Sequence, residues 1–272
     1  MMKKILVPTD FSEGAFNALI HAIYAASILD NSIEIIHAYS MPAAGTNVMV
    51  DITDILKKNA EEEMEGLKKR VQILEIAQNT EITYHTAYGS VVDVINRKAN
   101  EENVSVVLMG TQGASGITEK WLGSNTAAAA RNVNVPLLAI PVERPYKDIE
   151  SILFSTDMKV MEDAGCMEFV AKLANITRAR VKFLHVRKSD EQPDEAGYKN
   201  QVEKFFTDVN PTFSFTYNEN IPAGIEETIK KENPSLLVVV RHDYGFFESI
   251  WHSSVSRQII NNASLPILVL NG

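Results

Sequence analysis

The second half of this chain repeats four short apolar segments of the first half, in the same order. Residues 4–10 (KILVPTD) return as 151–157 (SILFSTD), and residues 33–38 (IEIIHA) return as 181–186 (VKFLHV). Residues 106–109 (VVLM) and 135–140 (VPLLAI) return as 237–240 (LVVV) and 265–270 (LPILVL). An ordered match of this kind is the mark of internal duplication, so we expect two units of the same fold.

Within each half, apolar runs rich in β-branched residues alternate with helical patterns. After Ser12 and Glu13, alanines and leucines recur three or four residues apart, which predicts that a helix starts there. Strands that alternate with helices are parallel, because a parallel neighbour requires a crossover connection. Each half therefore reads β-α-β-α-β-α-β-α-β. A short charged link between Pro141 and Pro145 predicts domains of residues 1–143 and 144–272.

The charge and hydropathy of the chain narrow the classes of partner. The formal net charge is −9, and the clustered Lys and Arg residues that neutralise phosphate backbones are missing, which argues against a general nucleic-acid binder. No segment is long enough to span a membrane, and the N-terminal apolar run is too short for a signal peptide. One cysteine, Cys166, rules out an internal disulfide bond, so we expect a cytoplasmic protein.

A glycine-rich segment follows the fourth apolar run of the first half. Residues 110–124 contain the pattern Gly-x2-Gly-x9-Gly-Ser, and an alanine-rich helix begins at its end. Glycines let backbone amides approach an anion, and a helix N-terminus adds unpaired N–H groups. Ligands of open parallel sheets bind beyond the carboxyl ends of the strands, where Asp10, Ala38 and Gly110 should converge. The pattern favours a phosphate site, although Gly110 and Gly113 taken alone are equally typical of turns.

Two common phosphate-binding motifs are missing from the chain. There is no Gly-x4-Gly-Lys-Ser/Thr loop and no Gly-x-Gly-x-x-Gly after the first strand. The motifs that are present are Val7-Pro8-Thr9-Asp10, His37-Ala38 and Met109-Gly110 with the glycine pattern that follows. Together they resemble the universal stress protein family in its ATP-binding subgroup, and the resemblance covers essentially the whole chain.

This resemblance implies an α/β fold of two tandem doubly wound five-stranded parallel sheets, each with strand order 3-2-1-4-5, similar to the adenine-nucleotide alpha hydrolases. It implies that the halves pair through their last strands as an intramolecular pseudo-dimer, and it leaves a further homodimer open. It also implies a stress-response regulatory protein that binds ATP, ADP or AMP in its N-terminal half, with Mg or Mn bridging the phosphates. The residues implied to contact the nucleotide are Pro8, Thr9, Asp10, Ala38, Met109, Gly110, Gly113, Gly123, Ser124 and Asn125.

The chain departs from the family pattern in both halves. In the first half Gln112 and Ala114 replace a His and a basic residue that members often carry, which argues against tight triphosphate binding. In the second half Arg241 and Tyr244 stand at the positions of Gly110 and Gly113. Bulky side chains would occupy the space that a phosphate needs, so we expect little or no nucleotide binding there.

No residue pattern predicts strong catalysis. We find no candidate base or arginine finger near the glycine pattern, so any ATP hydrolysis or phosphate transfer should be slow. The spacing of Arg241, His242, Asp243 and His252 matches no metal motif. The main alternative is an interaction scaffold with vestigial pockets. A phosphohydrolase or adenylyl-transferring enzyme is a third interpretation, but its expected Ser-Gly-Gly or Asp-rich signature is missing.

Overall fold

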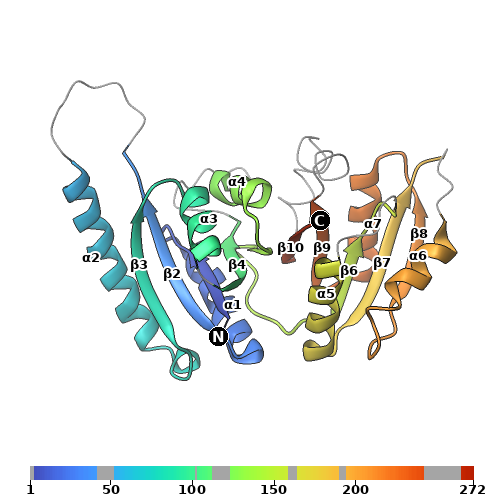
Figure 1. Cartoon of the computed structure of the whole chain (residues 1–272), viewed down its shortest axis with the longest axis horizontal. Coiled ribbons are helices and arrows are strands. Elements are labelled where there is room, and N and C mark those ends of the chain that lie inside the picture. Colours follow the sequence, from blue (N-terminus) through green and yellow to red (C-terminus); the bar gives the residue numbers. More distant parts are fainter. Residues whose placement is uncertain are drawn as a thin grey trace. The chain divides into compact units, whose positions relative to one another are not determined.

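The computed structural model describes residues 3–41, 52–101, 103–111, 123–158, 164–189, 194–241 and 265–272. These residues form two compact units, and the chain passes from the first to the second between Val142 and Glu143 (Figure 1). Each unit is described by itself. Within the described ranges, no helix combines the length and apolar composition that crossing a membrane requires.

In the described part of the first unit, five parallel strands form a sheet of order β3-β2-β1-β4-β5. The strands are β1 (Lys4–Pro8), β2 (Ser32–Tyr39), β3 (Ile82–Tyr88), β4 (Val104–Gly110) and β5 (Leu137–Ile140). The connecting helices are α1 (Glu13–Leu29), α2 (Thr53–Gln72), α3 (Val91–Glu101) and α4 (Ser124–Asn132), and a short 3-10 helix, η1 (Glu75–Ala77), precedes β3. The predicted order 3-2-1-4-5 is confirmed.

The second unit repeats this topology. Its described strands are parallel neighbours in the order β8-β7-β6-β9-β10. They are β6 (Ser151–Ser155), β7 (Arg180–Arg187), β8 (Thr212–Tyr217), β9 (Leu236–Arg241) and β10 (Ile267–Asn271). The helices are α5 (Ala164–Thr177), α6 (Glu195–Val202) and α7 (Ile221–Glu232). The duplication seen in the sequence therefore corresponds to two copies of one doubly wound sheet.

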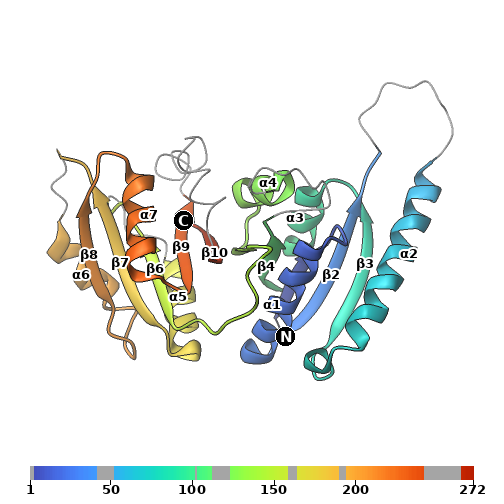
Figure 2. The same cartoon turned by 180° about the vertical axis from the view of Figure 1, so that it is seen from behind.

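Burial on both faces explains the apolar composition of the central strands. In the first unit α1 covers one face of the sheet, and α3 and α4 cover the other (Figures 1 and 2). Ile5, Leu6 and Val7 of β1 are consequently fully buried. Helix α1 begins where the sequence predicted, because the Ser12 side chain accepts a hydrogen bond from the Ala15 N–H at 3.2 Å and caps the helix.

The turn that follows the first strand is the same in both units. The Phe11 N–H donates to Thr9 Oγ1 at 3.0 Å, and the Met158 N–H donates to Thr156 Oγ1 at 3.0 Å. Phe11 and Met158 also share the left-handed backbone conformation, with φ of 63° and 56°. A bulky residue is rarely found there, so its recurrence indicates that the turn constrains the backbone in both copies.

A histidine of the second strand holds each of these turns. His37 Nδ1 lies 2.8 Å from the Thr9 carbonyl oxygen, and His185 Nδ1 lies 3.0 Å from that of Thr156. Because the acceptor is a carbonyl, Nδ1 is the protonated nitrogen in each ring. Both histidines are therefore hydrogen-bonded to the backbone of the turn in their own unit.

Candidate functional site

A cavity of about 240 Å³ opens at the carboxyl ends of β1, β2 and β4 in the first unit. Nine of the ten residues that the sequence assigned to a nucleotide line it: Pro8, Thr9, Asp10, Ala38, Met109, Gly110, Gly123, Ser124 and Asn125. The tenth, Gly113, lies outside the described residues, as do Gln112 and Ala114. Four further lining residues were missed by sequence reasoning, namely Ala15, Ile36, Val91 and Thr126.

Side chains from one face of the sheet make an apolar wall. Ile36 and Ala38 are two residues apart on β2, so they point to the same face, and Ile36 is paired in register with Pro8 of β1. Val91, the first residue of α3, lines the cavity from the helix layer. The same alternation could have identified Ile36 from Ala38 in the sequence. An apolar wall of this kind is suited to a flat ring system.

The N-terminus of α4 supplies the polar end of the cavity. The helix begins as predicted, with Gly123 as N-cap and Ser124 as its first residue, and no side chain among the described residues caps it. Gly123 N–H donates to the Thr111 carbonyl, and Thr126 Oγ1 donates to the Gly110 carbonyl at 2.7 Å, which joins the helix start to β4. The amide N–H groups of an uncapped first turn, together with the positive end of the helix dipole, favour an anion.

Asp10 places a carboxylate at the same opening. Its Oδ1 accepts hydrogen bonds from Ser12 Oγ at 2.6 Å and from the Ser12 N–H at 3.2 Å. These bonds fix the carboxylate in the turn between β1 and α1. An ionised carboxylate only accepts hydrogen bonds, so Asp10 is suited to hydroxyl or amino groups of a ligand and not to a phosphate.

Gly110 has a packing role that its motif did not reveal. A Cβ at this position would lie 2.5 Å from the Gly14 carbonyl oxygen and 3.1 Å from the Ala15 nitrogen, both in α1. The missing side chain therefore lets α1 approach β4 closely. The backbone of Gly110 lines the cavity, and the position where a Cβ would lie faces α1.

The second unit has larger residues at the matching positions. The strand register corrects the expected match of Arg241 to Gly110. Gly110 pairs with Ile140 of β5, and Val240 pairs with Leu270, the repeat counterpart of Ile140. Val240 therefore takes the position of Gly110, and Arg241 that of Thr111. Val186 replaces Ala38 and is 4% exposed, and a Cβ at Gly224 of α7 would lie only 2.6 Å from its Cγ1. The added methyl groups are thus packed against α7. His242, Asp243, Tyr244 and His252 lie outside the described residues.

The potential metal-ligating side chains do not come together as a metal centre in the part of the chain that the structure describes. No group of three or more His, Cys, Asp or Glu side chains there could hold a metal ion. Asp10 is the one carboxylate among the described lining residues of the cavity.

An ion pair at the start of α1 predicts a pH dependence of stability. Arg70 Nη1 and Nη2 each donate to the Glu13 carboxylate at 2.8 Å, and the guanidinium lies 3.5 Å from the centre of the Phe16 ring. The hydrogen bonds from Arg70 lower the pKa of Glu13. A lowered folded-state pKa gives stability that is present above the unfolded pKa and is lost as the pH falls through the folded pKa.

Glu13→Gln should therefore lower the melting temperature at pH 7. The difference in melting temperature from wild type should become smaller as the pH is lowered towards 3. The Glu13 side chain is 76% exposed, so the loss at pH 7 should be only about 0–1 kcal/mol. Thermal unfolding at several pH values measures this difference. Glu61→Gln, in an exposed pair with Lys57 at 3.9 Å, is the control. A Glu13→Gln effect that is constant with pH would contradict the prediction.

Comparison with known proteins gives two matches to one family. A model described as the universal stress protein family matches residues 1–141 and again residues 150–271. A universal stress protein of Methanocaldococcus jannaschii is 27% identical over 154 residues, which cover 54% of this chain and 86% of that protein. Universal stress protein G of Salmonella typhimurium is 27% identical over 145 residues, which cover 52% of this chain and 99% of that protein.

Solved structures show the same fold at full length. A universal stress protein from Archaeoglobus fulgidus aligns over 98% of both chains, with a TM-score of 0.77 and 19% identity. A universal stress protein solved in complex with cAMP is 24% identical and covers 51% of this chain and 96% of its own, with a TM-score of 0.39. The alignment with the Archaeoglobus fulgidus structure includes both units, so the similarity in fold covers the whole chain.

Proposed function

Because this chain belongs to the universal stress protein family, we propose that it is a regulatory protein of the stress response that binds an adenine nucleotide in the cavity of its first unit. One observation carries the proposal: a single cavity of about 240 Å³ joins an apolar wall, a fixed carboxylate and an uncapped helix N-terminus. These are the groups that a flat base, a sugar hydroxyl and a phosphate require.

In this proposal the phosphate groups accept hydrogen bonds from the first turn of α4. The base lies along Ile36, Ala38 and Val91, and Asp10 accepts a hydrogen bond from the sugar or base. The described residues of the cavity do not supply a metal-binding cluster, so the proposal contains no metal ion held by the protein alone. We also propose that the second unit binds no nucleotide, which the larger Val240 and Val186 at the positions of Gly110 and Ala38 support.

Calorimetric titration of the folded protein with ATP, ADP, AMP and cAMP, each with and without Mg, tests the proposal. We expect binding of at least one adenine nucleotide with a stoichiometry of one per chain. The panel includes cAMP because one universal stress protein has been solved in complex with it. No heat with any nucleotide, in protein shown to be folded, would contradict the proposal and favour the interaction scaffold.

Ala38→Val should weaken nucleotide binding about tenfold. It introduces the residue that the second unit carries at the matching position, and overpacking of this kind costs on the order of 1–3 kcal/mol. Val186→Ala is the matched control, because it makes the reverse change in the second unit and should leave the affinity unchanged. Equal affinities for wild type and Ala38→Val would show that the nucleotide does not lie against Ala38.

A further inference from the structure

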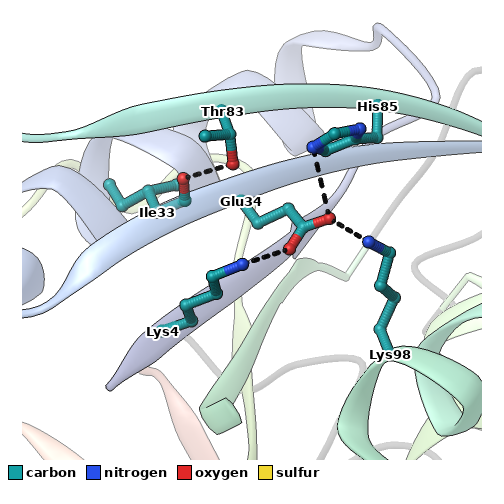
Figure 3. A network of polar contacts seen from close by, with 6 residues as sticks. All are labelled: Lys4, Ile33, Glu34, Thr83, His85 and Lys98. Carbon is teal, nitrogen blue, oxygen red and sulfur yellow. Dashed lines mark hydrogen bonds and ion pairs between the residues drawn. The ribbon is translucent and has the colours of Figure 1, made fainter. Parts of the chain in front are cut away.

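A buried carboxylate joins three elements of the first unit (Figure 3). Glu34 of β2 is fully buried, and Lys4 Nζ of β1 donates to its Oε2 at 3.2 Å. Lys98 Nζ of α3 lies 2.6 Å from Oε1, and His85 Nε2 of β3 lies 3.7 Å from the same oxygen. At 2.6 Å the Lys98 contact is a close ion pair. No sequence motif had pointed to this cluster.

The cluster and the cavity lie along the same two facing surfaces. Glu34 shares its face of β2 with Ile36 and Ala38, which line the cavity, because residues two apart on a strand point the same way. On α3, Lys98 follows Val91 by about two turns, so these two side chains also share a face. The interface between β2 and α3 therefore has the ion pair towards one end and the cavity wall at the other.

Between these ends the contact of α3 is apolar. Val94 and Ile95 are fully buried. Apolar burial is non-directional, so by itself it determines weakly where a helix sits along a strand. A buried ion pair at 2.6 Å has one favourable position, since separating its charges leaves a carboxylate unpaired.

We infer that Glu34 is a positioning residue for the ligand of the first unit. Through Lys98 it sets the position of α3 along β2, and with it the position of Val91 at the wall of the cavity. The inference rests on the proposed function for the identity of that ligand.

The second unit also has an ion pair between the equivalent strand and helix. Lys182 of β7 occupies the position of Glu34 in the repeat, and its Nζ lies 2.6 Å from Glu232 Oε2 at the end of α7. Helix α7 takes the place of α3 in the repeat. This pair is more exposed than that of Glu34, with the side chains of Lys182 and Glu232 35% and 26% exposed. Because we propose no nucleotide binding in the second unit, Lys182 offers a control outside the nucleotide site.

Two variants test this inference. One is the single variant Glu34→Gln, and the other is the double variant that combines Glu34→Leu with Lys98→Met. Glu34→Gln keeps the size of the side chain and removes its charge. We expect it to weaken ATP binding about threefold to tenfold and to speed amide hydrogen exchange in α3 but not in α4. The double variant restores apolar packing without a directional contact. We expect it to recover stability but not ATP affinity, whereas a purely structural role would recover both. Lys182→Met, the control in the second unit, should leave ATP affinity unchanged.

Two results would overturn the inference: full ATP affinity in the double variant, or unchanged affinity and unchanged exchange of α3 in Glu34→Gln. If the wild-type protein binds no nucleotide, the proposed function fails by itself. Exchange of α3 without ligand then decides the role of Glu34. Faster exchange in both variants supports the positioning role, and unchanged exchange overturns it.

Discussion

Gly110→Ala should lower the free energy of unfolding by about 3 kcal/mol, the upper end of the usual overpacking cost. The new Cβ would lie 2.5 Å from the Gly14 carbonyl oxygen, a backbone atom within the first turns of α1. Relief of the clash requires a shift of the whole helix away from β4. Since Ala15 of the same helix lines the cavity, the shift should also weaken nucleotide binding. Urea-induced unfolding measures the first effect and calorimetric titration the second.

Gly66→Ala is the matched control for this substitution. Gly66 lies on the exposed face of α2, and a Cβ there would meet nothing within 4 Å. Alanine favours the helix over glycine by about 0.5–1 kcal/mol, so this variant should be more stable than wild type. If Gly110→Ala is as stable as wild type, the glycine is not required for the packing of α1 on β4.

Glu34→Leu should destabilise the protein by about 3 kcal/mol, because removal of one partner leaves buried or half-buried cations without their counter-charge. The Lys98 side chain is 18% exposed and that of Lys4 is 31% exposed, so partial hydration keeps the loss at the lower end of the usual range. Adding Lys98→Met should recover most of the loss, since a well-packed apolar pair often replaces a buried ion pair at little cost. Urea-induced unfolding of the single and double variants gives the coupling energy.

An exposed ion pair gives a reference value for the effect of losing a surface ion pair on stability. Lys57 and Glu61 lie 3.9 Å apart on α2, and both side chains are 55% exposed. Lys57→Met should change the free energy of unfolding by no more than about 0.5 kcal/mol. If the double variant at Glu34 and Lys98 loses as much stability as the two single variants together, the two side chains are not coupled.

Much of the site was predictable because its residues follow strand ends. The run KILVPTD predicts a buried strand that ends at Asp10, and parallel topology brings that end beside Ala38 and Gly110. Ser12 and Gly123 were predicted at helix starts, and both are N-caps. Such features depend on a few neighbouring residues and on a repeat that can be read directly.

The role of Glu34 could not be predicted in this way. A charged residue inside the run IEIIHA is visible in the sequence, but its partners come from β1, β3 and α3. Which of the many lysines lies opposite it depends on strand register and on the position of a helix over the sheet. The same is true of Gly110, whose closest contact is the backbone of Gly14.

Local pattern and internal repetition were therefore enough for two units of parallel strands alternating with helices and for the convergence of Asp10, Ala38 and Gly110. The family resemblance added the strand order and the other residues of the cavity. Packing between layers decided the rest. It set Gly110 against α1, packed Val186 of the second unit against α7, and enclosed the Glu34 carboxylate between a strand and a helix. The physical reason is that these contacts join residues far apart in the chain, and their distances exist only once the helices lie on the sheet.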